Sequence, residues 1–94
     1  MSEIDDKFFE RADEHINLSN EQLSNVESGK VSASMLFSTA RFNAWVTACG
    51  FKDGHEMKAA KEQMIKYFVT EYEKMLTENI DDYIENFDKY MKRS

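Results

Sequence analysis

Residues 32–49 read SASMLFSTARFNAWVTAC, and they carry the most informative pattern in the chain. Plotted at 100° per residue, the apolar residues of this stretch fall on two opposite sides of a helix. One side carries Met35, Phe42, Val46 and Cys49, and the other carries Ala33, Leu36, Phe37, Ala40, Ala44 and Ala48. A helix that is apolar on two sides is normally buried between neighbours. We therefore expect this helix to lie at the centre of the fold.

Further helical patterns flank the central stretch on both sides. A first helix is predicted over residues 3–24, with apolar residues at Ile4, Phe8, Ala12, Ile16 and Leu23. A third pattern follows residue 54 and carries Met57, Met64, Phe68, Tyr72 and Met75, and a last stripe carries Ile80, Ile84, Phe87 and Met91. The chain has no proline and only three glycines, which favours helices throughout. We expect an all-α fold, a three- or four-helix bundle with a central second helix, in a single domain of residues 1–94.

Capping residues predict where the first two helices begin and end. Ser2 and Asp5 give a weak capping box before the first helix. The polar residues 24–29 form the expected turn, and Ser32 is then the expected N-cap of the second helix. Gly50 is expected to end that helix in a left-handed conformation.

The third helix is expected to begin at Asp53, which forms an Asp-x-x-Glu capping arrangement with Glu56. Further along, the apolar stripe advances by about a quarter turn near Asn79, so a break there is the simpler expectation. Asp81 and Asp82 would then stabilise the start of a fourth helix. The alternative is one helix over residues 54–92, about 60 Å long, which would imply an intertwined oligomer.

The composition limits the classes of function. The net charge of −6 weighs against binding nucleic acid and against binding an anionic membrane surface. Seven Phe, four Tyr, six Met and one Trp are more than so small a bundle can shield, so we expect a homo-oligomer and allow an unidentified protein partner. The lone cysteine and the polar N-terminal segment predict a cytoplasmic protein.

No catalytic set or metal site can be assembled from the sequence. Helical di-iron sites use Glu-x-x-His, but Ala12 lies three residues before His15 and Lys52 lies three residues before His55. Cys49 ends an apolar face, where a core cysteine is more usual than a reactive thiolate. We expect no catalytic residue, no metal ligand and no cofactor.

Four residues are candidates for binding a ligand or a partner: Arg41, Asn43, Trp45 and His15. Arg41 is the only charged residue of the central stretch, and a guanidinium there could anchor a carboxylate or phosphate. It could instead pair with an acid on a neighbouring helix, such as Glu71, and we favour this ion pair. Trp45 is either a core residue or a hot spot at a partner surface.

Several short blocks, taken together and in order, resemble a family of short bacterial proteins. The blocks read FFERAD at residues 8–13, GKVSASM at 29–35, ARFNA at 40–44, YFV at 67–69 and NIDDYIENFD at 79–88. The family is known only as a domain of unknown function, number thirty-one forty-four. The resemblance covers nearly the whole chain and implies a bacterial, cytoplasmic, helical protein that stands alone as one domain. It implies no activity and no site residues.

The function expected from these observations is that of a non-catalytic module for protein interaction or homo-oligomerisation. The alternative is a small-ligand-binding protein or enzyme with a pocket near Arg41, Asn43 and Trp45. A weaker third hypothesis is an acidic decoy for a nucleic-acid-binding protein. Lysines interleaved with the acids of the C-terminal half argue against that decoy.

Overall fold

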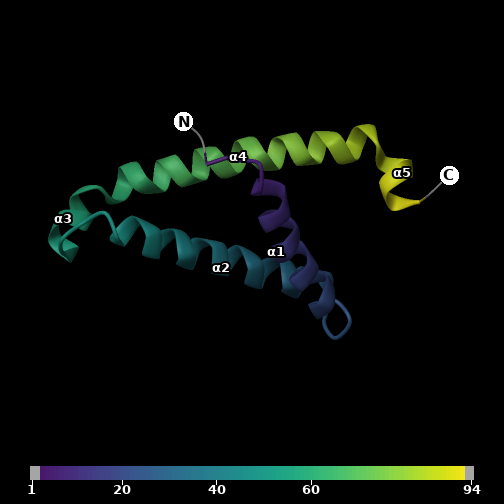
Figure 1. Cartoon of the computed structure of the whole chain (residues 1–94), viewed down its shortest axis with the longest axis horizontal. Coiled ribbons are helices and arrows are strands. Elements are labelled where there is room, and N and C mark those ends of the chain that lie inside the picture. Colours follow the sequence, from purple (N-terminus) through teal and green to yellow (C-terminus); the bar gives the residue numbers. More distant parts are fainter. Residues whose placement is uncertain (1–2, 93–94) are drawn as a thin grey trace. The chain divides into compact units, whose positions relative to one another are not determined.

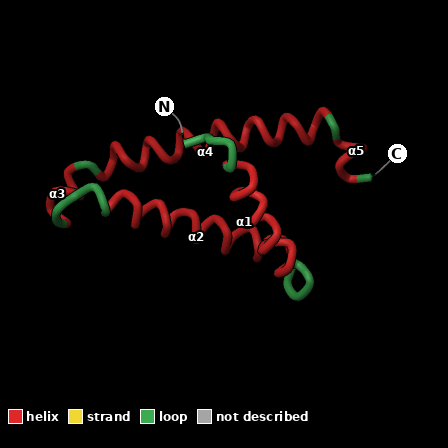
Figure 2. The backbone as a smooth tube through the Cα atoms, in the orientation of Figure 1, coloured by secondary structure: helices red, strands yellow, loops and turns green. Residues whose placement is uncertain are grey.

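The computed structural model describes residues 3–92, and over that range the chain is all-helical, with five helices and no strand (Figures 1 and 2). The expected all-α class is therefore confirmed. No helix in this range is both long and apolar enough to cross a membrane. The helices are α1 (Phe8–Gln22), α2 (Ser28–Ala48), α3 (Gly54–Ala59), α4 (Lys61–Glu85) and α5 (Phe87–Met91).

The chain divides into two units with separate internal contacts. Unit 1 ends at Val46 and holds α1 with most of α2, whereas unit 2 begins at Thr47 and holds α3, α4 and α5. Each unit is a short series of helices, and the segments between them are drawn in green in Figure 2. The helices of each unit are thus set by local hydrogen bonding and by few contacts between elements.

The start of α1 is fixed by the side chain of Asp5. Its Oδ1 accepts a hydrogen bond from the Lys7 backbone N–H at 2.9 Å, and its Oδ2 lies 3.2 Å from the Arg11 guanidinium. These bonds occupy the segment before Phe8, so α1 begins at that residue and not at residue 3 as predicted. The Ser2 half of the predicted capping box lies outside the described residues.

The second helix begins at Ser28, four residues before the predicted cap. The backbone N–H groups of Lys30 and Val31 donate to the Glu27 carbonyl at 3.0 and 3.2 Å, which starts the helix one turn early. The predicted N-cap at Ser32 is therefore wrong, because this residue lies inside the helix. A glycine at position 29 did not prevent this, since it adopts ordinary helical backbone angles with open space beside it.

The end of α2 also differs from the prediction. No described glycine has a positive φ, so the left-handed conformation predicted for Gly50 is wrong. The Gly50 N–H instead donates to the Thr47 carbonyl at 3.0 Å, and the Phe51 N–H donates to the Ala48 carbonyl at 3.1 Å. These i to i−3 bonds tighten the last turn and satisfy carbonyls that a left-handed cap would otherwise serve.

Within unit 1, α1 lies against the first half of α2 (Figure 1). Val31 is the one buried hydrophobic among the described residues, at 5% exposure, and Met35 is half-buried. The Ser19 hydroxyl of α1 donates to the Met35 sulfur at 3.5 Å. Both apolar sides of α2 nevertheless stay exposed at Leu36 and Phe42. The central position expected for this helix is not provided by unit 1 and remains a prediction.

In unit 2, α3 begins as predicted at Asp53. Its carboxylate accepts from the Glu56 backbone N–H at 2.8 Å, and the Glu56 side chain in turn accepts from the Lys52 N–H at 2.8 Å. The reciprocal bonds satisfy donors that the first turn would leave unpaired. This helix ends after six residues at Ala60, whose φ of −100° and ψ of 2° separate it from α4.

The long helix α4 runs without interruption through Asn79, so the predicted break there is wrong. The Asn79 side chain donates to the Met75 carbonyl at 2.7 Å, one turn back, and in this way stays within the helix. The break comes at Asn86, with φ −116° and ψ 29°. A single helix over residues 54–92 is not formed either, because the backbone also breaks at Ala60.

The corner between α4 and α5 is closed by Asp82. Its two carboxylate oxygens accept from the Asn86 amide at 2.9 Å and from the Tyr90 hydroxyl at 3.0 Å. The Tyr90 ring also lies against the Tyr83 ring, with centroids 4.7 Å apart. Side chains one and two turns apart thus hold α5 to the end of α4.

Candidate interaction surface on helix α2

The exposed aromatic side chains of α2 lie around its predicted site residue Arg41. Phe37 precedes this residue by one turn, and Phe42 and Trp45 follow it, so the helix period gathers the four side chains over less than half of its circumference. The exposed fractions are 69% for Phe37, 63% for Phe42 and 61% for Trp45. We call these four residues the α2 patch.

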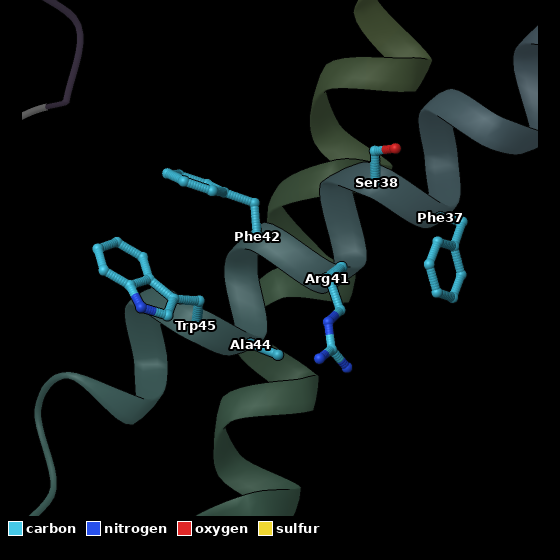
Figure 3. A pocket seen from close by; sticks show the side chains of 6 residues that line it. All are labelled: Phe37, Ser38, Arg41, Phe42, Ala44 and Trp45. Carbon is cyan, nitrogen blue, oxygen red and sulfur yellow. The ribbon is translucent and has the colours of Figure 1, made fainter.

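The two later aromatic residues of the α2 patch form a pair. The ring centroids of Phe42 and Trp45 are 5.6 Å apart, and the ring planes are inclined at 34°. The two rings lie side by side in Figure 3. Contact between aromatic rings restricts the rotamers of both side chains while leaving much of their surface exposed to water. The pair therefore presents a broad, partly ordered apolar surface.

A hollow of ≈ 540 Å³ lies between the side chains of the patch. Its lining consists of Phe37, Ser38, Arg41, Phe42, Ala44 and Trp45, all of which belong to α2 (Figure 3). A space bounded by one helix has no opposite wall. It can receive the side chains of a protein surface, but it does not enclose a small molecule as a ligand pocket does.

The charge of the surface comes from Arg41. No acid lies anywhere in α2, and the described part of unit 1 gives this guanidinium no ion pair. Glu71, which the sequence suggested as its partner, bonds within α4 to the Lys74 amino group at 3.1 Å. The arginine is thus an exposed cation beside aromatic rings, which is the chemistry of an acceptor for carboxylates.

The structure brings together only two of the four predicted site residues. Arg41 and Trp45 line the same hollow. Asn43 does not line it, because two residues along a helix correspond to about 200° and place this half-buried side chain on the other side. His15 lies on α1, is exposed and does not line the hollow either. A shared site for all four residues is therefore not formed by α2.

Phe37 and Phe42 are members of the patch that the sequence reasoning missed. Both were assigned to the apolar sides of a buried helix. The signal that would have found them is their spacing from the predicted site residues, since Phe37 lies four residues before Arg41 and Phe42 lies three residues before Trp45, and residues three or four apart are neighbours on a helix surface.

The cysteine and the second histidine are both exposed side chains. Cys49 is exposed, so the expectation of a core cysteine is wrong: the residue follows the last residue of α2, where the chain turns. His55 is exposed in the first turn of α3. Over residues 3–92, no three His, Cys, Asp or Glu side chains are grouped closely enough to hold a metal ion.

Comparison with known proteins agrees with the resemblance found in the sequence. A solved structure similar to this chain is the NMR structure of the protein NB7890A from Shewanella sp., with 41% sequence identity, coverage of 97% of each chain and a TM-score of 0.79. No curated protein sequence matches the chain. The family model described as "Protein of unknown function (DUF3144)" matches residues 8–84. The chain therefore belongs to this family of unknown function.

Proposed function

We propose that this protein is a non-catalytic interaction module that binds another protein chain through the apolar faces of its helices. The observation that carries the proposal is the α2 patch, where three aromatic side chains are more than 60% exposed on one helix. Folded monomers rarely leave large contiguous apolar surfaces in water, and such surfaces commonly mark sites of association.

The composition of the patch supports a protein partner. Tryptophan, tyrosine and arginine are the residues that contribute most often to binding hot spots, and phenylalanine is enriched at interfaces. The patch combines Trp45 with Arg41 and two phenylalanines. A partner with an apolar ridge and a nearby carboxylate would cover the rings and neutralise the guanidinium.

The three- or four-helix bundle expected from the sequence would form only when another chain binds, and it is therefore part of this proposal. The large apolar side chains that unit 1 covers on α2 lie near α1, at Val31 and Met35. A helix of another chain placed along the second half of α2 would bury the second apolar side and complete a three- or four-helix bundle. Oligomer formation would then supply the core that the sequence pattern requires.

Site-specific photo-crosslinking in bacterial cells tests the proposal. A benzoylphenylalanine replaces Phe42 in one variant, and Asp13 on the exposed face of α1 in the matched control. We expect a covalent adduct with a protein chain at position 42 and little or none at position 13. Absence of any adduct at position 42, in a chain that retains its helical circular dichroism, would overturn the proposal.

The alternative function, binding of a small ligand near Arg41, Asn43 and Trp45, has less support. Small-ligand sites bury most of the ligand surface between several elements, and the hollow at Arg41 is bounded by one helix. A set of carboxylate and phosphate metabolites that raised the melting temperature of the chain, but not that of Arg41→Gln, would favour this alternative.

A further inference from the structure

Helix α4 carries a second apolar surface, separate from the α2 patch and contained within unit 2. Its residues follow one another at spacings of 4, 3, 4, 4 and 3: Ile65, Val69, Tyr72, Leu76, Ile80 and Tyr83. The mean spacing equals the helix period, so all six side chains lie within about 80° of one another around the helix. We call these residues the α4 seam, which extends about 27 Å along the axis.

The seam has no cover within its own unit. Each of its six side chains is exposed, with fractions between 42% at Leu76 and 59% at Val69. The half-buried residues of α4 lie on the adjacent side, at Met64 and Phe68. Large apolar side chains repeated every three or four residues are the pattern by which helices pair, each inserting between four residues of a partner helix.

We propose that the seam binds the same seam of a second copy, with the two α4 helices antiparallel. This inference rests on the proposed function, since it names the partner of one interaction surface. The order of the seam residues favours the antiparallel arrangement. Pairing about a two-fold axis near residue 74 places Ile65 opposite Tyr83 and Tyr72 opposite Leu76, while Val69 faces Ile80 within one position. Each tyrosine then packs against an aliphatic side chain, and the two-fold axis repeats each of these contacts.

The charges along α4 select the same orientation. Residues 61–70 contain two lysines and one glutamate, for a net charge of +1, whereas residues 71–85 contain one lysine and six acids, for a net charge of −5. A parallel pair would place the two acidic halves together, which is unfavourable. An antiparallel pair places each acidic half beside the basic half of the other copy.

The seam also has the area that a dimer needs. Roughly half of each of six large side chains is exposed, which corresponds to about 500 Å² per copy and about 1,000 Å² for the pair. A specific interface needs about 1,000 Å² in total, and Met75 and Ile84 at the borders of the seam, at 48% and 69% exposure, add to it. Two seams with these borders therefore reach the area that a small specific dimer needs.

Charge insertion tests the seam. Val69→Lys with Leu76→Lys places two ammonium groups in each seam, and Thr70→Lys with Thr77→Lys adds the same charge outside it. Sedimentation equilibrium of the full chain is expected to show a dimer for the wild type and the control variant. The seam variant is expected to raise the dimer dissociation constant roughly 100-fold or more. Equal dissociation constants for the two variants would overturn the proposal.

Distance measurement tests the orientation without disturbing the seam. In a Cys49→Ser background, spin labels at Glu85→Cys are expected about 33 Å apart along the axis of an antiparallel pair centred at residue 74. Glu85 lies on the face of α4 opposite the seam, so a parallel pair would place the two labelled Cα atoms about 15 Å apart, with no separation along the axis, and would overturn the inference. A wild-type chain that stays monomeric would also overturn it. The proposed function would survive that result if photo-crosslinking at position 42 captured a different protein.

Discussion

The carboxylate of Asp82 joins the last helix of unit 2 to the end of α4 through two hydrogen bonds. Because it accepts the Tyr90 hydroxyl hydrogen, and because burial and the negative charge add to that bond, the pKa of Tyr90 is raised above its ordinary value of 10.0. A group with a raised folded pKa contributes stability below its unfolded pKa and loses it as the pH rises through the folded value. The corner between α4 and α5 is therefore sensitive to alkaline pH.

We predict that α5 loosens from α4 as the pH rises above 10, when the Tyr90 hydroxyl ionises beside the Asp82 carboxylate. The Cα chemical shifts of residues 87–91, followed by NMR across the pH range, measure the effect. Tyr90→Phe should show the shifts of a less ordered helix already at neutral pH and no further change at the alkaline transition. Tyr67→Phe, which removes a hydroxyl elsewhere in unit 2, should behave like the wild type. Chemical shifts in Tyr90→Phe that match those of the wild type at every pH would contradict this account of the corner.

The hydrogen bonds of the Asp5 carboxylate make the start of α1 sensitive to acid pH, whereas the Tyr90 corner is sensitive to alkaline pH. The Lys7 backbone N–H and then the Arg11 guanidinium hold the pKa of Asp5 below 3.8. A lowered folded pKa gives stability that is present above the unfolded pKa and is lost as the pH falls through the folded value. The order of the first turn of α1 should therefore decrease below pH 4.

Asp5→Asn is predicted to remove this acid transition and to increase amide exchange in the first turn of α1 at neutral pH. The asparagine can still accept from the Lys7 N–H but has no charge for the guanidinium of Arg11. Asp6→Asn is the matched control, one residue along and with the same loss of charge. If both variants exchanged at the same rate, the Asp5 contacts would not be what fixes the start of α1.

At the scale of the helices, the cap of α3 is the clearest local determinant. Asp53→Ala removes the acceptor of the Glu56 N–H and should cost about 1 kcal/mol, the usual loss for an N-cap. Urea unfolding followed by circular dichroism measures the change in the free energy of unfolding. Lys58→Ala, in the same helix but away from its cap, should change it by less than about 0.5 kcal/mol. If Asp53→Ala also lowered the free energy of unfolding by less than about 0.5 kcal/mol, α3 would not depend on its cap.

The helix boundaries show what the sequence could and could not predict. The all-α class and the start of α3 were predictable, because missing breakers and a reciprocal capping pair act through neighbouring residues. The starts of α1 and α2 and the continuity of α4 were not. They depend on which of several competing bonds forms: Asp5 with Lys7 and Arg11, Glu27 with the backbone of the next turn, and the Asn79 amide with the carbonyl one turn back.

The site was predictable only in part for a related reason. Arg41 and Trp45 were chosen for their chemistry, and the helix places both beside the same hollow. Asn43 is close to both residues in sequence, yet it lies on the other side of α2 and does not line the hollow. Phe37 and Phe42 were assigned to a core, because periodicity identifies an apolar side of a helix and does not say what covers it.

At the scale of the whole molecule, both units expose large apolar side chains on helices that are otherwise well formed. The α2 patch and the α4 seam together hold five of the twelve aromatic residues of the chain. Burial of one hydrophobic side chain among the described residues offsets little of the entropy lost on folding. The central claim is therefore that a second chain completes the core.

The concentration dependence of unfolding tests that claim most directly. Urea unfolding is measured at two protein concentrations 100-fold apart, with the emission of the single tryptophan, Trp45, as the probe. A chain whose core requires a second copy should gain about 2.7 kcal/mol of stability at the higher concentration, seen as a higher urea midpoint. A midpoint that does not change, together with a Trp45 emission typical of a buried indole at both concentrations, would show that one chain covers its own apolar faces and would contradict the account.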